Sequence, residues 1–265
     1  MNLPLVFDIV CLTRSGIKIG ASRPTPEKKQ KRNHKLHTDI RLPDPLLPGD
    51  MIGIVAPAGA FDKARFQAGL QVLKKAGFRV TVPEALFNRH RYMAGADADR
   101  ADLLHQMFAD ESIQAIMCAR GGFGTMRILP LLNFQLIADN PKFFAGFSDI
   151  SILLTVIYEQ TQMATLHAPV ITSLADADSQ TITSMLNGLT DAADIQIKPN
   201  KPIILAGGRA SGPVCGGNLA SLTSLIGTPY QPDFSGRLLF LEDTSEAPYR
   251  IDRMLTQMRL AGCLE

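Results

Sequence analysis

Residues 49–76 read GDMIGIVAPAGAFDKARFQAGLQVLKKA, and this stretch decides the class of fold. Its apolar run at 51–56 lies between Gly-Asp and Pro-Ala-Gly, a pattern typical of a strand buried on both faces of a parallel sheet. From 62 to 76 apolar residues recur with helical spacing, and Gly77 stands where a helix commonly ends. A buried strand followed by an amphipathic helix predicts an α/β fold.

The same alternation continues along the next hundred residues. Further strands are predicted at 78–82, 113–119 and 143–146, and further helices at 99–108, 126–138 and 150–160. Pro130 lies inside the second of these helices, where a proline disturbs helical hydrogen bonding. Strands that alternate with helices favour a mostly parallel sheet flanked by helices.

Beyond about residue 175 the pattern loosens. Helices are predicted at 184–189, 218–226 and 249–260, and brief strands at 195–197, 203–205 and 238–241. We therefore expect a second, smaller and incomplete C-terminal α/β domain. The expected division is a basic extension without regular structure at 1–45, a first α/β domain at 46–175, a linker at 176–200 and a partial C-terminal domain at 201–265.

Composition excludes several classes of protein. Of the 265 residues, 46% are hydrophobic and 20% charged, unlike a disordered chain or a coiled coil. No apolar run approaches the ~20 residues of a membrane span. The four cysteines lie far apart without a CxxC pair, which argues against a zinc ribbon and fits a reducing compartment. We expect a soluble, cytoplasmic protein that does not bind a membrane.

The charge is unevenly divided along the chain. Residues 1–40 hold eight basic and three acidic residues, a net charge of +5. The remainder holds 19 basic and 22 acidic residues, a net charge of −3. The body therefore offers no basic surface suited to a phosphate backbone, and we expect no nucleic-acid partner.

Three segments follow predicted strands, at the edge where open α/β sheets bind ligands. In 119–124, ARGGFG, adjacent glycines allow N–H groups to approach an anion, although a plain tight turn has the same composition. In 145–150, AGFSDI, Ser148 stands where α/β hydrolases carry a nucleophile, or else Ser148 or Asp149 caps the helix. In 239–243, LFLED, an acid either orients a histidine or is solvated in a turn.

Taken together, five motifs resemble the LD-carboxypeptidase family of serine peptidases, which includes the murein tetrapeptide carboxypeptidases and the microcin C self-immunity peptidases. They are GDMIGIVAPAGAFD (49–62), ARGGFG (119–124), GFSDI (146–150), GGNLASLTSLIGTP (216–229) and LEDTSEAPYRIDRML (241–255). The resemblance extends from about Leu46 to the last residue, with the motifs in family order.

The resemblance implies roles for five residues. Ser148 matches the nucleophile, and Glu242 matches the acid that orients a histidine. The backbone N–H groups of Gly122 and Asp149 match the oxyanion hole, and Asn218 falls where substrate peptide is contacted. The family implies a homodimer without metal or organic cofactor, and a muropeptide substrate that loses its C-terminal D-alanine during cell-wall recycling.

The family's catalytic histidine belongs downstream of 241–255, beyond Glu265. The histidines of the chain are His34, His37, His90, His105 and His167. Of these, His167 follows a strand and could face the site, but a structural role is favoured for a single histidine. We therefore expect a C-terminally truncated peptidase of low or no activity. Two alternatives stay open: a muropeptide-binding remnant that does not cut, and an unrelated anion-binding α/β module.

Overall fold

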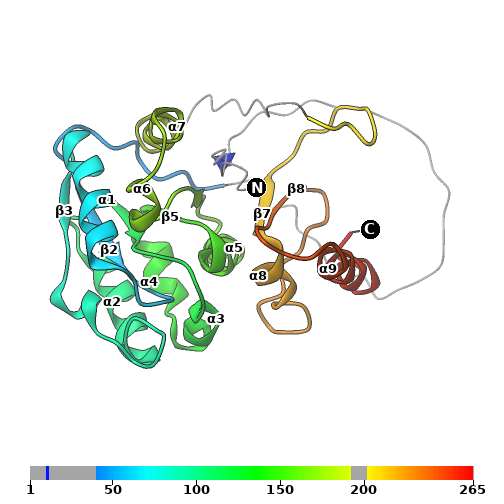
Figure 1. The fold of residues 1–265 in the computed structure, drawn as a ribbon, viewed down its shortest axis with the longest axis horizontal. Coiled ribbons are helices and arrows are strands. Elements are labelled where there is room, and N and C mark those ends of the chain that lie inside the picture. The colour runs from blue at the N-terminus through cyan, green and yellow to red at the C-terminus, as the bar shows by residue number, and fades with distance from the viewer. Residues whose placement is uncertain (1–9, 12–39, 192–201, 265) are drawn as a thin grey trace.

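The computed structural model describes residues 10–11, 40–191 and 202–264, which form two α/β units (Figure 1). The larger unit has a six-stranded sheet in the order β1-β6-β5-β4-β2-β3. Its strands are β1 (Val10–Cys11), β2 (Met51–Val55), β3 (Arg79–Thr81), β4 (Ala115–Cys118), β5 (Phe143–Gly146) and β6 (Leu166–His167). All neighbours pair in parallel except β1, which runs antiparallel to β6. The predicted mostly parallel sheet is confirmed.

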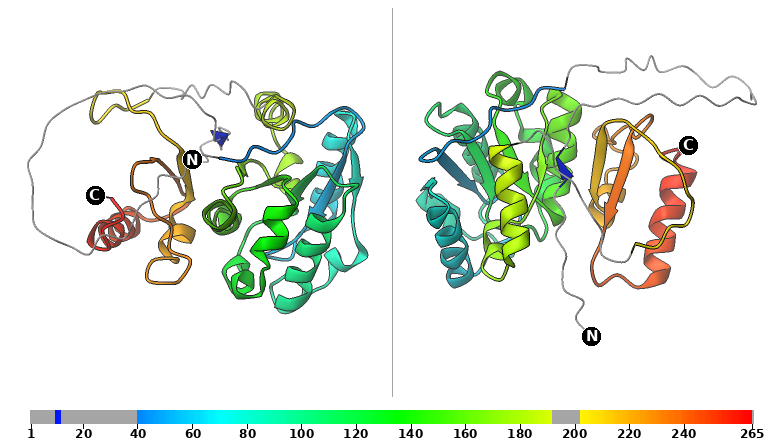
Figure 2. Two further views of the ribbon diagram at one scale, coloured as in Figure 1. Left: turned by 180° about the vertical axis from the view of Figure 1, so that it is seen from behind. Right: turned by 90° about the horizontal axis from the view of Figure 1, so that it is seen from above.

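The direction of strand addition reverses at β2, because β3 pairs with one edge of β2 and β4 pairs with the other. Right-handed crossovers in opposite directions place helices on both faces of the sheet. One layer holds α1 (Lys63–Lys75) and α6 (Ile171–Leu174), and the other holds α2 (Asp97–Ala109), α4 (Phe134–Asp139) and α5 (Ser151–Thr161), as Figure 2 shows. The loops after β2 and β4 therefore leave toward opposite faces, and open α/β sheets bind ligands at such a reversal.

The core lies between the sheet and these two layers. Every residue of β4 and β5 is buried, as expected for parallel strands covered on both faces. Four phenylalanines fill much of the interior and are fully buried: Phe66, Phe108, Phe143 and Phe144. The core thus provides a rigid support for the loops that leave the carboxyl ends of the strands.

The smaller unit has a two-stranded parallel sheet of β7 (Val214–Asn218) and β8 (Leu238–Glu242). Its helices in the described range are α8 (Leu219–Thr223) and α9 (Pro248–Leu260). Its own small core contains Cys215, Leu219, Phe234 and Met258. An ion pair between Arg237 and Glu159 of α5 joins the two units.

Several predicted elements differ from the structure. The stretch at 126–138 is mostly helical, as predicted, but it is divided at Pro130: the chain forms α3 (Thr125–Ile128), a 3-10 turn (Leu129–Leu131) and then α4. The predicted strand at 203–205 has no regular structure, and its side chains are 76–95% exposed. The predicted strand at 195–197 lies outside the described residues.

The predicted linker and the predicted N-terminal extension both contain regular structure. The interval 176–200, predicted as a linker, includes α7 (Ser179–Thr190), whose Met185 and Leu189 are buried in the large core. Within the predicted extension at 1–45, β1 pairs with β6, and most of the other residues lie outside the described ranges. No helix in the part of the chain that the structure describes is both long and apolar enough to cross a membrane.

Gly69 lies where α1 packs closely against α6, so a substitution at this position tests the packing. A β-carbon on Gly69 would overlap the carbonyl oxygen of Ile171. Although alanine favours a helix over glycine by about 1 kcal/mol, we expect Gly69→Ala to destabilise the fold by about 2 kcal/mol or more. Thermal unfolding followed by circular dichroism measures the change, with Gln67→Ala on the exposed side of α1 as the control. An unchanged Tm in Gly69→Ala would contradict the close approach of the two helices.

Candidate active site

The turn between β5 and α5 holds Ser148 in an unusual backbone conformation. Phe147 is extended, with φ −153°, whereas Ser148 has φ +63°, in the left-handed region that non-glycine residues seldom adopt. A short 3-10 turn (Ser148–Ile150) then leads into α5. Gly146 is needed beneath this turn, because a β-carbon there would lie 2.8 Å from Cγ2 of Ile150. The strand–turn–helix geometry is that of an elbow that presents a nucleophile above the sheet.

The ARGGFG loop after β4 lies directly against this serine. A β-carbon on Gly121 would be 2.9 Å from Cβ and 3.1 Å from Oγ of Ser148, so only glycine permits the approach. Gly122 follows with φ +106° and is exposed. Within the described residues, no acceptor takes the N–H of Gly122 or of Asp149, and the Ser148 hydroxyl forms no hydrogen bond. Two backbone donors and one hydroxyl are thus free beside one another.

The side chain of Asp149 has a structural role. Its buried carboxylate accepts hydrogen bonds from the backbone N–H of Thr125, at 2.9 Å, and from the Thr125 hydroxyl, at 2.6 Å. Burial raises the pKa of Asp149, and the bonds from Thr125 oppose that rise. The contact ties the start of α3, and with it the end of the ARGGFG loop, to the turn that carries Ser148. The backbone N–H of Asp149 has no acceptor in the described residues and is open to a ligand.

Glu242 and Asn218 end the two strands of the small sheet and are partners in its register. The Asn218 side chain caps α8 by accepting from the backbone N–H of Ser221 at 3.0 Å, and it also hydrogen-bonds Glu242. Burial raises the pKa of Glu242, the bond from Asn218 lowers it, and the neighbouring charge of Asp243 raises it. Oε1 of Glu242 is buried without a hydrogen-bond partner in the described residues. A buried carboxylate oxygen without a partner can accept a hydrogen bond from a donor group that approaches it.

The small sheet reaches the elbow through Ser151, the first residue of α5. The Asn218 N–H donates to Oγ of Ser151 at 3.0 Å, and Gly217, with φ +138°, lies against the same side chain. Glu242 is the register partner of Asn218, so it lies on the side of the small unit that faces the elbow. Sequence reasoning did not identify Ser151, although a second serine three residues after Ser148 was the available signal.

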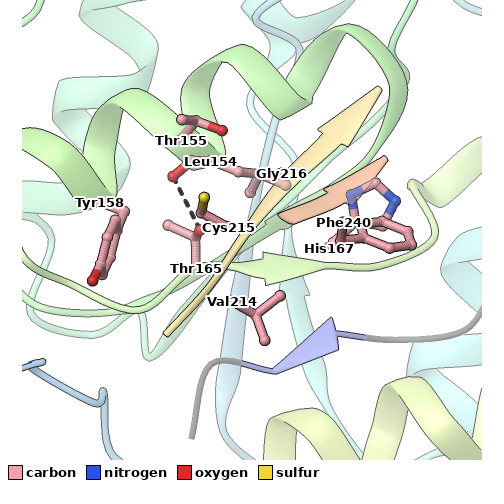
Figure 3. A pocket seen from close by; sticks show the side chains of 9 residues that line it. All are labelled: Leu154, Thr155, Tyr158, Thr165, His167, Val214, Cys215, Gly216 and Phe240. Atoms are coloured by element: carbon pink, nitrogen blue, oxygen red, sulfur yellow. Dashed lines mark hydrogen bonds between the residues drawn. The ribbon is translucent and has the colours of Figure 1, made fainter. Parts of the chain in front are cut away.

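His167 lies beside this contact and lines a pocket between α5, β6 and the small sheet (Figure 3). Its ring meets Phe147 and Phe240 edge to face, with centroids 6.3 and 5.2 Å away. Burial lowers its pKa to about 4. Nδ1 of His167 and Oγ1 of Thr155 are buried without a hydrogen-bond partner in the described residues. The aromatic enclosure fits the structural role that was favoured for His167.

The other described histidines also lack a contact with Ser148. Nε2 of His105 accepts from the backbone N–H of Asn133 at 2.9 Å, and His90 is exposed. His34 and His37 lie outside the described residues. The structure therefore brings Ser148, Gly122 and Asp149 together and connects them to Asn218 and Glu242 through Ser151. No metal-binding group of three or more histidine, cysteine or acidic side chains occurs in the described ranges.

A parallel α/β sheet that presents a serine on a left-handed turn between free N–H groups defines a candidate hydrolase. Comparison with sequence models of known families agrees with this class. The LD-carboxypeptidase N-terminal domain matches residues 52–168, and the LD-carboxypeptidase C-terminal domain matches residues 211–265. The chain belongs to the LD-carboxypeptidase family.

Individual relatives lead to the same family. The chain is 40% identical over 226 residues to a probable murein peptide carboxypeptidase of Bacillus subtilis, covering 84% of this chain and 71% of that protein. It is 32% identical over 219 residues to a murein tetrapeptide carboxypeptidase of Pseudomonas aeruginosa, covering 78% and 70%. The crystal structure of an MccF-like protein from Bacillus anthracis superposes with a TM-score of 0.75 at 27% identity, covering 83% and 76%. The predicted family is confirmed, and the unrelated anion-binding module is excluded.

The burial of His167 predicts a pH dependence of stability. Its pKa is about 4 when folded and about 6.5 when unfolded, so below about pH 6.5 the unfolded chain binds a proton that the folded chain does not. Stability is therefore lost as the pH falls from about 6.5 to about 4, by about 3 kcal/mol in all. In His167→Phe, Tm should fall less between about pH 7 and about pH 4.5 than in the wild type.

Differential scanning fluorimetry at both pH values measures this effect. His90→Gln serves as the control, because it removes an exposed histidine and should leave the wild-type pH profile unchanged. Equal losses of Tm in the wild type and in His167→Phe would show that His167 is not held neutral by burial.

Proposed function

We propose that the protein is a serine-type LD-carboxypeptidase that removes the C-terminal D-alanine from a murein tetrapeptide in cell-wall recycling. The observation that carries the proposal is the left-handed Ser148 beside the free N–H groups of Gly122 and Asp149. Family membership and the murein peptide carboxypeptidases among its relatives support the choice of substrate.

In this proposal the Ser148 hydroxyl attacks the carbonyl carbon that precedes D-alanine while a base removes its proton. The negative charge that develops on the carbonyl oxygen is stabilised by the N–H groups of Gly122 and Asp149, each worth about 3 kcal/mol in comparable sites. When the tetrahedral intermediate collapses, the C–N bond breaks and the amine of D-alanine takes up the proton. Water then gives a proton to the base and attacks the ester that joins the peptide to Ser148. The ester C–O bond breaks, Ser148 regains its proton and the shortened peptide leaves.

Glu242 is assigned to the orientation of the base. A half-buried carboxylate whose buried oxygen has no partner can accept a hydrogen bond from the second nitrogen of an imidazole and favour its protonated form. None of the histidines in the described residues occupies that position, since His105 is bonded to Asn133 and His167 is enclosed by aromatic rings. We therefore propose that a polypeptide of these 265 residues turns over slowly. The same observation favours a second candidate, a protein that binds muropeptide without cutting it.

The proposed location, oligomeric state, cofactors and partners rest on the family and on the charge of the chain. We propose that the protein acts in the cytoplasm, as a homodimer, with no metal or organic cofactor. We also propose that it has no nucleic-acid or membrane partner, because the net charge of residues 41–265 is −3. Asn218 is proposed to contact the substrate peptide, since it hydrogen-bonds Glu242 at the end of the small sheet.

Release of D-alanine from a murein tetrapeptide tests the proposed reaction. We expect the 265-residue chain to release D-alanine roughly 10⁴-fold or more slowly than the Pseudomonas aeruginosa relative, because loss of the base in a serine triad has an effect of this size. Coupled detection of free D-alanine measures the rate, and calorimetry with the same peptide measures binding. A rate close to that of the relative would refute the impaired activity. Binding without any release would favour the non-cutting alternative.

Imidazole added to the assay should supply the base that, in this proposal, no histidine of the described residues provides. We expect tens of millimolar imidazole to raise the rate of D-alanine release several-fold, following the fraction of imidazole that is unprotonated. The rise requires the Ser148 hydroxyl, so it should be absent in Ser148→Ala. Ser112→Ala is the matched control, because it removes an exposed hydroxyl that is bonded to Asp110 before the amino end of β4, away from the proposed site. Rescue that persists in Ser148→Ala would remove this serine from the mechanism.

A further inference from the structure

The side chain of Arg120 bridges the loops that diverge after β4 and β2. Its Nη1 donates to the carbonyl oxygen of Ala60 at 2.6 Å, and its Nε would lie 3.9 Å from a β-carbon on Gly122. The two loops are also joined by a bond from the N–H of Gly59 to the carbonyl of Gly121, at 3.1 Å. A guanidinium group is thus held in place beside a proposed oxyanion donor, at the point where the strand order reverses.

This cation has no anionic partner in the described residues. Arg120 is exposed, and within the described residues its side chain donates to a neutral carbonyl, that of Ala60. Three other arginines of the larger unit are bound to carboxylates, since Arg100 and Arg127 both pair with Asp97 and Arg65 pairs with Asp176. A guanidinium that is fixed by a neutral acceptor keeps its charge and most of its N–H donors for a ligand.

The surroundings of Arg120 also suit a ligand. The rings of Tyr92 and Phe123 lie 5.9 Å apart and are 59% and 53% exposed, although both are large aromatic side chains. The carbonyl of Tyr92 accepts from the N–H of Ala60, at 3.0 Å, which places this pair next to the same two loops. Exposed aromatic residues gathered beside a fixed charge are a common feature of binding surfaces.

We infer that Arg120 binds the free carboxylate of the C-terminal residue that is removed from the substrate, and this inference rests on the proposed function. Successive carbonyl carbons of a peptide are roughly 3 to 4 Å apart, so a carbonyl held by Gly122 places the terminal carboxylate within reach of a guanidinium beside that glycine. Two parallel N–H···O bonds match a carboxylate and distinguish it from an amide or a continuing chain. Arg120 is therefore a specificity-determining residue that restricts the enzyme to the last residue of a peptide.

Binding of two peptides tests the role of Arg120 independently of turnover. One is the murein tetrapeptide with a free C-terminal carboxylate, and the other is the same peptide ending in an amide. Calorimetry in a Ser148→Ala background prevents hydrolysis of either peptide. We expect the acid to bind about 10- to 100-fold more tightly than the amide, the range for a hydrogen-bonded charge. Arg120→Ala and Arg120→Gln should abolish this ratio by weakening the acid alone.

Arg79→Ala is the matched control. Arg79 is also exposed and also donates to a backbone carbonyl, that of Gly49 at 2.7 Å, but it lies on the edge strand β3. Replacement of Arg79 should leave unchanged the ratio of the affinities for the peptide acid and the peptide amide. Arg120→Gln keeps a donor for Ala60 without the charge, and an unchanged Tm in this variant excludes misfolding as the cause.

The outcomes separate the inference from the proposed function. If the Ser148→Ala protein binds the peptide acid more tightly than the peptide amide, and adding Arg120→Gln keeps that preference, the role of Arg120 is overturned while the proposed substrate stands. If the Ser148→Ala protein binds neither peptide, the proposed substrate is wrong, and the proposed role of Arg120 is overturned with it.

Discussion

The left-handed backbone of Ser148 is the constraint on which the rest of the site depends. A non-glycine residue in this region costs about 1 to 3 kcal/mol, so the surrounding structure must hold it there. Gly146 lets Ile150 pack beneath the turn, and Gly121 lets the neighbouring loop close over it. The buried bonds from Thr125 to Asp149 fix the far side. Because the turn is held from three directions, the hydroxyl and the following N–H stay clear of competing bonds in the described residues.

The same turn also determines how the two units meet. Since α5 begins immediately after it, Ser151 faces the end of β7 and accepts the N–H of Asn218. The positive φ of Gly217 allows that close approach. Asn218 is the register partner of Glu242, so the position of this carboxylate follows from the direction of α5. A buried carboxylate oxygen without a hydrogen-bond partner is costly and is more typical of functional sites than of structural ones.

The elements that depend on local pattern could be predicted from the sequence, and those that depend on distant partners could not. The strand at 143–146 agrees with β5, because four consecutive apolar or small residues suit a covered parallel strand. The strand β7 was missed, because its glycines lie in a stretch that resembles a loop and pair only when β8 approaches. For Ser148, the sequence left a nucleophile and a helix cap as alternatives. The positive φ of Ser148 argues against a capping role for this residue, since an N-cap residue has an extended backbone, while its role as nucleophile stays a proposal.

The order of the strands explains why the proposed functional groups lie in one row. β2, β4 and β5 are neighbours in the sheet, and the loops from their carboxyl ends supply Ala60, Arg120 with Gly122, and Ser148 in that sequence. The small sheet adds Glu242 on the far side of Ser148, through α5. Under the proposed function, a peptide laid along this row has its terminal carboxylate at the β2 side and its reacting carbonyl over β4 and β5. The base then approaches from the β8 side. Under the same proposal, the short distance from Gly122 to the guanidinium of Arg120 leaves room for one residue beyond the reacting carbonyl.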